Sequence, residues 1–199
     1  MGKNRPIEIT DIIDRETYAR RRKQLRAEMV ALKRNRRVAI GPNATAHFEN
    51  FATMLYQVHE MLHAERGGET QLADELAAYN PLIPRGSELV CTLMLEMEDP
   101  ARRSVFLSGL GGIERTTRLE IGGEIIPAEW EQDVERTSDS GKASAVHFLR
   151  FALSREQAAK MKMKDARVIV SIEHPNYGHA TVLPELVRAE LAADLSDPT

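Results

Sequence analysis

The sequence predicts an α+β fold: a single domain, residues 1–199, in which an antiparallel or mixed sheet is covered by helices. Two observations lead to it. Apolar residues recur at helical spacing in residues 1–86, so this N-terminal region is expected to be mainly helical. In residues 87–199, runs of alternating apolar and polar residues are separated by shorter helical patterns, so this region is expected to contain the sheet. Helices followed by strands interleaved with helices are typical of the α+β class.

The N-terminal elements follow from caps and periodicity. Residues 1–10 are expected to be extended, and Thr10 or Asp11 can cap a first helix that continues from Asp14. The pair Gly67-Gly68 is expected to stop a long central helix. The elements expected here are helices at residues 14–28, 48–66 and 69–79 and a strand at 37–40, with Asn43 or Thr45 as the cap of the central helix.

The C-terminal elements are predicted in the same way. A Gly122-Gly123 pair between two short apolar runs indicates a hairpin. Ser154, followed by Glu156-Gln157, indicates a helix start. Residues 131–142 are polar and are expected to form a loop. The elements expected here are strands at 88–98, 144–153 and 167–173, helices at 100–110, 154–163 and 185–195, a hairpin at 118–126 and a loop at 174–179.

The composition excludes several classes of protein. An apolar content of 42% and a charged content of 29% are ordinary for a globular protein. A single cysteine, Cys91, excludes a disulfide framework, a cysteine-based zinc site and an iron–sulfur cluster held by this chain alone. The N-terminus lacks the apolar core of a signal peptide, and no apolar run approaches the roughly 20 residues that span a membrane. We therefore expect a cytosolic protein with no membrane association.

The segment from Arg20 to Arg37 is strongly basic, with Glu28 as its one acidic residue. Such a run can be a solvated helix face, or it can be a docking patch for RNA or an acidic partner. No aromatic residues are interleaved with it, and the net charge of −3 gives no global attraction to nucleic acid. One candidate function is therefore a metal-free partner-binding module that uses residues 20–37.

The central helix carries an apolar arc and a polar edge. At about 100° per residue, Glu60 points away from the apolar arc and is expected to face solvent. Glu65 falls inside the arc, where a carboxylate needs a partner. The apolar arc consists of Phe51, Met54, Leu55, Val58, Met61 and Leu62, and the stripe along its edge consists of Ala52, Tyr56, His59 and His63.

Residues 59–63 have the letters of the zinc-protease motif H-E-x-x-H. Two histidines at i and i+4 can share a zinc ion while the glutamate polarises water. The later glycine and histidine of the extended motif are missing after His63. The alternatives are a polar helix edge and a metal site that is not a protease, so a zinc hydrolase is the weakest of the three interpretations.

A second group of histidines lies near the last predicted strand. His174 and His179 flank a loop held by the sheet, and loops of this kind often carry sites. These histidines can cap backbone groups or bind a metal, and His147 can join them from a neighbouring strand. If the central helix packs over this end of the sheet, a mixed histidine and carboxylate site suited to iron or zinc results. The candidate metal ligands are His174, His179, Glu65, His59, His63 and His147.

Five segments resemble a bacterial domain-of-unknown-function family over nearly the whole chain: RRVAIGPNATAHFEN at 36–50, MLYQVHEMLHAER at 54–66, AYNPLIP at 78–84, SAVHFLRF at 144–151 and HPNYGH at 174–179. The resemblance implies a gene found beside a rubrerythrin and an iron–sulfur oxidoreductase of the heterodisulfide-reductase type. It also implies that Glu60, Glu65, His174 and His179 follow the family pattern.

His59 and His63 depart from that pattern, because glutamine and arginine can stand there, and this argues against the protease interpretation. The leading prediction is a cytosolic accessory protein of a redox or iron-linked system. It would bind iron or zinc through histidines and carboxylates and act with the rubrerythrin or the oxidoreductase. Whether it is an enzyme is left open by the sequence.

Overall fold

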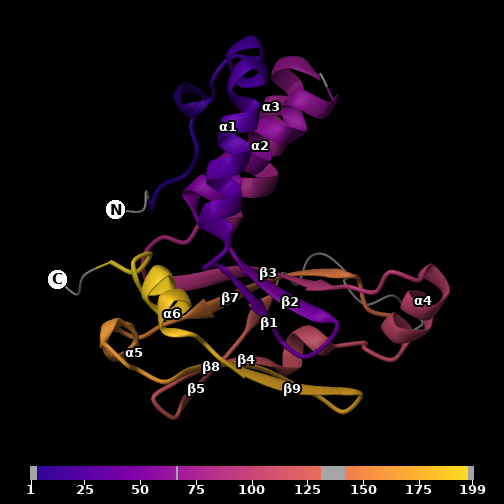
Figure 1. The fold of residues 1–199 in the computed structure, drawn as a ribbon, viewed down its shortest axis with the longest axis vertical. Coiled ribbons are helices and arrows are strands. Elements are labelled where there is room, and N and C mark those ends of the chain that lie inside the picture. The colour runs from indigo at the N-terminus through magenta and orange to yellow at the C-terminus, as the bar shows by residue number, and fades with distance from the viewer. Residues whose placement is uncertain (1–3, 66, 131–141, 197–199) are drawn as a thin grey trace.

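The computed structural model describes residues 4–65, 67–130 and 142–196, and it confirms the α+β class. Two antiparallel sheets pack face to face, and a layer of helices stands on the outer side of one of them (Figure 1). The five-stranded sheet has the order β1 (Arg37–Ala39), β2 (Ala44–Phe48), β3 (Glu88–Leu95), β7 (Val146–Ala152), β6 (Glu129–Trp130). The four-stranded sheet has the order β5 (Glu124–Pro127), β4 (Thr117–Ile121), β8 (Val168–His174), β9 (Tyr177–Val182).

The core between the two sheets is built by alternation along their strands. In β7, Leu149 and Phe151 are buried, while Phe148 and Arg150 are half-buried on the other face. Antiparallel strands with one face in the core show this pattern, and the buried faces of both sheets join one hydrophobic cluster. The sheets therefore cover each other as a sandwich, and the helix-covered antiparallel sheet that we expected is its five-stranded half.

The β2 strand corrects a prediction. Asn43 and Thr45 were expected to cap the central helix, but residues 44–48 pair with β3. The helix begins at Phe51, where the Asn50 side chain accepts a hydrogen bond of 3.0 Å from the Thr53 amide. The run is only five residues long, and its pairing with a distant strand, not its local pattern, makes it a strand. The mainly helical region thus contributes two strands to the five-stranded sheet.

The helical layer consists of α1 (Arg15–Lys33), α2 (Phe51–Glu65) and α3 (Gly68–Tyr79), preceded by residues 4–14. Asp14 caps α1 through the Thr17 amide at 2.9 Å, and the predicted caps Thr10 and Asp11 belong to a 3₁₀ turn instead. Most of the predicted apolar arc of α2 is confirmed by a second hydrophobic cluster that also includes Val90 of β3. The layer is therefore fastened to the outer face of the five-stranded sheet.

The segment at residues 174–179, expected as a loop, is a tight hairpin. His174 ends β8, Tyr177 begins β9, and only two residues form the turn between them. Tyr177 and Thr181 fasten β9 to the chain around β1, because their hydroxyls donate to the carbonyls of Ile40 and Ala39 at 2.7 and 2.6 Å. Sequence patterning missed β9 because most of its residues are exposed, so apolar alternation is weak.

Three further helices complete the fold: α4 (Pro100–Ser108), α5 (Arg155–Lys162) and α6 (Glu185–Ala192). The capping box predicted at Ser154 and Gln157 is present at the start of α5. The hairpin predicted around Gly122-Gly123 is formed by β4 and β5. The loop predicted at 131–142 lies almost entirely outside the described residues. In the part of the chain described, no helix is both long enough and apolar enough to cross a bilayer.

Candidate functional site

The polar edge of α2 meets α1 in a cluster of three side chains. Arg22 of α1 binds both carboxylate oxygens of Glu60, at 2.8 Å from Nε and 2.7 Å from Nη2. The Tyr18 hydroxyl, one turn earlier on α1, donates to the same carboxylate. The prediction that Glu60 faces solvent is wrong, since its side chain is 22% exposed. The reason is that α1 packs along this edge, which a helical wheel of α2 alone does not show.

The electrostatics of this cluster hold it in one protonation state. Hydrogen bonds from Arg22 and Tyr18 lower the pKa of Glu60 to about 2, although partial burial opposes this. Burial and the adjacent carboxylate raise the pKa of Tyr18. Glu60 is therefore ionised and Tyr18 is protonated at neutral pH. A carboxylate with so low a pKa is a weak general base, so Glu60 is poorly suited to activate water.

His59 uses both ring nitrogens within the fold. Nδ1 donates to the Leu55 carbonyl at 2.8 Å, and Nε2 accepts from the Ile13 amide at 3.1 Å. Burial lowers the pKa of His59, and its ring stacks on Tyr18 with 4.9 Å between centroids. The imidazole is thus neutral and has no nitrogen left for a metal. Together with the paired Glu60, this geometry does not fit an H-E-x-x-H hydrolase.

His63 and Glu65 lie towards the end of α2. The His63 ring meets the Tyr18 ring edge-on at 5.8 Å, and its Nδ1 atom is buried without a hydrogen-bond partner among the described residues. Glu65 is exposed, although its place on the wheel suggested burial, and it accepts a hydrogen bond of 3.3 Å from Gln71 of α3. The end of the helix has left the core by this point, so Glu65 needs no buried partner.

The other three histidines among the predicted ligands occupy separate surroundings. His174 contacts the Gly111 carbonyl at 3.3 Å and accepts from the Asn176 amide at 3.2 Å. His179 is exposed, with its ring edge-on to Tyr177 at 4.5 Å. His147 is buried in the sandwich, where Nε2 donates to the Ser144 carbonyl at 2.9 Å and Nδ1 lies 3.5 Å from a Glu114 oxygen.

The six predicted ligands do not converge. In Figure 1, α2 lies in the upper helical layer and the β8–β9 hairpin lies at the lower edge, with the five-stranded sheet between them. His59 and His63 gather around Tyr18, whereas His147, His174 and His179 lie in or beside the sandwich. Within the described ranges, no group of three or more histidine, cysteine, aspartate or glutamate side chains could hold a metal ion.

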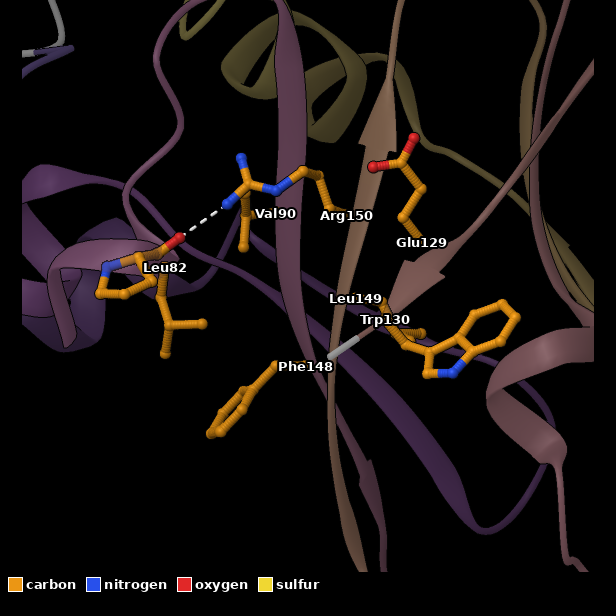
Figure 2. A pocket seen from close by; sticks show the side chains of 8 residues that line it. Leu82, Val90, Glu129, Trp130, Phe148, Leu149 and Arg150 are labelled. Atoms are coloured by element: carbon orange, nitrogen blue, oxygen red, sulfur yellow. Dashed lines mark hydrogen bonds between the residues drawn. The ribbon is translucent and has the colours of Figure 1, made fainter. Parts of the chain in front are cut away.

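The surface has hollows in more than one place, and the largest of those described, about 850 Å³, lies between the end of β3 and α4. Two others lie in the helical layer. A cavity of about 610 Å³ lies between residues 12–18, α2 and α3, and one of about 420 Å³ lies between α1 and α2. Tyr18 and His59 line both. Figure 2 shows a smaller pocket of about 180 Å³ beside Phe148 and Trp130, where Arg150 donates to the Pro81 carbonyl at 2.7 Å. Sequence reasoning missed Tyr18, whose polar surroundings arise only when α1 meets α2.

The basic segment is divided by the fold. Arg36 is 1% exposed and donates to the carbonyls of Phe48 and Glu49 at 3.0 and 3.1 Å, and it pairs with Asp194. Arg22 forms an ion pair with Glu60. These two arginines are therefore paired within the protein, so a partner would meet the other cations of the segment.

Comparison with known proteins places this fold in a family. A family described as protein of unknown function, DUF3501, matches residues 6–195. The chain belongs to the DUF3501 family. The crystal structure of a novel protein of unknown function from Burkholderia pseudomallei K96243 is similar to it, with 38% identity and a TM-score of 0.89. That similarity covers 96% of this chain and 99% of the other. A search of curated proteins gave no match.

Membership of DUF3501 confirms the resemblance to a family of unknown function. The two proteins are 38% identical and share the DUF3501 fold along nearly the whole chain, so both contain the helical layer and the sandwich. The expected link to a rubrerythrin or an iron–sulfur oxidoreductase stays a prediction. Neither description names an activity, so a function for this DUF3501 protein is argued from its surface and its cavities.

Proposed function

We propose that this DUF3501 protein is a partner-binding module and that α1 docks an acidic protein surface. The observation that carries the proposal is a stripe of cations on α1, formed by Lys23, Arg26, Lys33 and Arg34 around Val30. Val30 is 60% exposed. None of the four cations forms an ion pair with the described residues, which sets them apart from Arg22 and Arg36. We call this surface the basic stripe.

The spacing of these residues makes them neighbours. On a helix, residues three and four apart lie one above the other, so Lys23 adjoins Arg26, and Val30 lies between Arg26 and Arg34. Like charges so placed repel one another and slightly destabilise an isolated helix. No described carboxylate pairs with these cations, so an external anionic surface would relieve their repulsion.

The distribution of charge favours an acidic partner. Residues 15–37 hold ten of the 27 basic residues and two of the 30 acidic residues of the chain. The remainder of the molecule is therefore acidic, although the whole chain carries only −3. Such a local field steers an oppositely charged surface onto the helix and raises the rate of association.

The chemistry of the stripe favours protein over nucleic acid. Nucleic-acid surfaces that bind single strands add aromatic side chains on which bases stack, and the stripe has none. Its centre is instead an aliphatic side chain, Val30, which can contact an apolar residue of a partner while the surrounding cations pair with carboxylates. The family resemblance suggests which acidic partner to test first, a rubrerythrin or an iron–sulfur oxidoreductase. With such a partner the protein would have an accessory role in a redox system, and this role is part of the proposal.

Amine-reactive cross-linking in cells tests the proposal directly, because two of the four cations of the stripe, Lys23 and Lys33, are lysines. Lys33 is half-buried at the edge of the stripe. We expect both lysines to cross-link to an acidic protein. The double change Arg26→Glu and Arg34→Glu keeps both lysines and should abolish the cross-links. The matched control, Arg102→Glu and Arg103→Glu on α4, changes the net charge equally and should preserve them. Cross-links that survive the α1 change as well as the control would refute the proposal.

A further inference from the structure

The larger cavity of the helical layer has the size and lining of a ligand site. Its volume of about 610 Å³ lies within the range of roughly 300–1,000 Å³ found for small-molecule pockets. Residues before and at the start of α1 form one wall, and α2 and α3 form the others. We call it the His63 cavity. Its lining includes Ile13, Arg15, Tyr18, Leu62, His63 and Leu72.

The walls of the His63 cavity are mostly apolar. Ile12 and Ile13 contribute from the chain before α1, and Leu62 and Leu72 contribute from α2 and α3. The stacked rings of Tyr18 and His59 close one side. A cavity of this kind takes an apolar body, because transfer of apolar surface from water is favourable by roughly 25 cal/mol per Å².

Most polar groups at the cavity are already engaged. His59 uses both ring nitrogens, and the Tyr18 hydroxyl is held by Glu60. Asp14 caps α1 through the Thr17 amide. The Gln71 amide accepts from the Gly67 amide at 2.6 Å and donates to the Met61 carbonyl at 3.2 Å, with two carboxylates nearby. These groups shape the cavity, but they have little capacity left for a ligand.

Two donors remain. Arg15 is exposed at the cavity and forms no ion pair within the part of the chain that is described. His63 has a buried Nδ1 with no partner there, and Nε2 likewise has no hydrogen bond to a described residue. With a proton on Nε2, the imidazole presents a donor at the nitrogen that is not buried. A guanidinium and an imidazole N–H together suit a carboxylate.

We infer that the His63 cavity binds a small organic carboxylate with an apolar body. Arg15 pairs with the carboxylate and His63 donates to it, while the chain of the ligand lies against Leu62 and Leu72. The inference stands apart from the docking role of the basic stripe, because Arg15 and His63 are not members of that stripe.

Calorimetric titration of the full chain with three probes tests the contributions of the carboxylate and of the apolar chain separately. Octanoate carries both, octanol lacks the charge and acetate lacks the apolar chain. We expect saturable binding of octanoate, at least about tenfold weaker binding of octanol, and none of acetate, since a charge-assisted hydrogen bond contributes on the order of one tenfold step. Equal affinities for octanoate and octanol, or no saturable binding of octanoate, would overturn the inference.

Three variants locate the site. Arg15→Gln and His63→Phe should each weaken octanoate about tenfold and leave octanol unchanged, since each removes one donor. Leu72→Trp should fill the cavity and abolish both. Lys23→Gln, on the same helix but outside the cavity, is the control and should bind octanoate as wild type does. Arg15 is exposed, so the Arg15→Gln variant should keep the fold. Unchanged octanoate binding by this variant would show that the site does not lie in this cavity.

Discussion

Arg36 and Asp194 form a buried ion pair that joins the chain before β1 to the chain after α6. The two residues are 158 positions apart. Arg36 also donates to the carbonyls of Phe48 and Glu49, so its guanidinium is bonded on several sides. One side chain thus holds the turn into the five-stranded sheet against the end of the molecule. The contact gives a structural role to an arginine of the basic segment, for which the sequence offered a solvated face or a docking patch.

Loss of Asp194 should be costly. Asp194→Ala leaves the Arg36 charge buried without its carboxylate, and breaking a buried pair in this way costs about 3–5 kcal/mol. Glu190→Ala is the matched control, because Glu190 reaches the same guanidinium at 3.3 Å but is 34% exposed. That change should cost at most about 1 kcal/mol. Urea denaturation measures both, and equal losses would contradict the assignment of Asp194 as the main partner.

Glu60 should make stability depend on pH in the acid range. Its folded pKa of about 2 lies below its ordinary value of 4.5, so its contribution is present above pH 4.5 and is lost as the pH falls towards 2. Because Arg22 is 42% exposed, we expect roughly 1–2 kcal/mol. Urea denaturation at pH 7 and pH 3.5 should show a smaller loss for Glu60→Gln than for wild type. Parallel losses would contradict the pairing.

His59 should act in a different pH window. Burial lowers its pKa below the ordinary value of 6.5, so the folded state binds a proton less readily than the unfolded chain. Its contribution is therefore present above pH 6.5 and is lost as the pH falls through the folded pKa. His59→Gln can keep one donor and one acceptor without titrating. Its melting temperature should change less between pH 7 and pH 5 than that of wild type. His47→Gln is the comparison at a half-buried histidine whose pKa burial also lowers.

Tyr18 should contribute through its ring more than through its hydroxyl. Tyr18→Phe removes one hydrogen bond to Glu60 and keeps the stack on His59, so we expect a loss of about 0.5–1.5 kcal/mol. Tyr18→Ala also removes a buried ring and should cost about 3–5 kcal/mol. The free energy of unfolding measures both changes. A phenylalanine variant as unstable as the alanine variant would show that the hydroxyl, not the ring, is the larger contribution.

Iron or zinc binding at the β8–β9 hairpin stays a prediction that elemental analysis tests. Protein purified without a tag or chelator should contain the metal, and His174→Ala should lose it, since imidazole nitrogen is a common ligand of both metals. His59→Gln serves as the control, because His59 belongs to α2, which lies away from the β8–β9 hairpin. Metal-free protein whose His174→Ala variant behaves like wild type would refute this prediction.

Local pattern decided much of the fold. The apolar arc of α2, the capping box at Ser154 and the hairpin at Gly122-Gly123 follow from residues close together in the chain, and each is confirmed. The strands β2 and β9 do not, because a short strand is stabilised by hydrogen bonds to a partner that the local pattern cannot identify.

The candidate site was also predictable only in part. The sequence by itself determined that α2 has a polar edge and that α1 is basic, since both depend on helical period and composition. Only the tertiary structure decided that Glu60 meets Arg22, that Arg36 is buried and that α2 lies away from the β8–β9 hairpin. These relationships arise from the packing of distant elements, which determines the partner and the burial of each side chain.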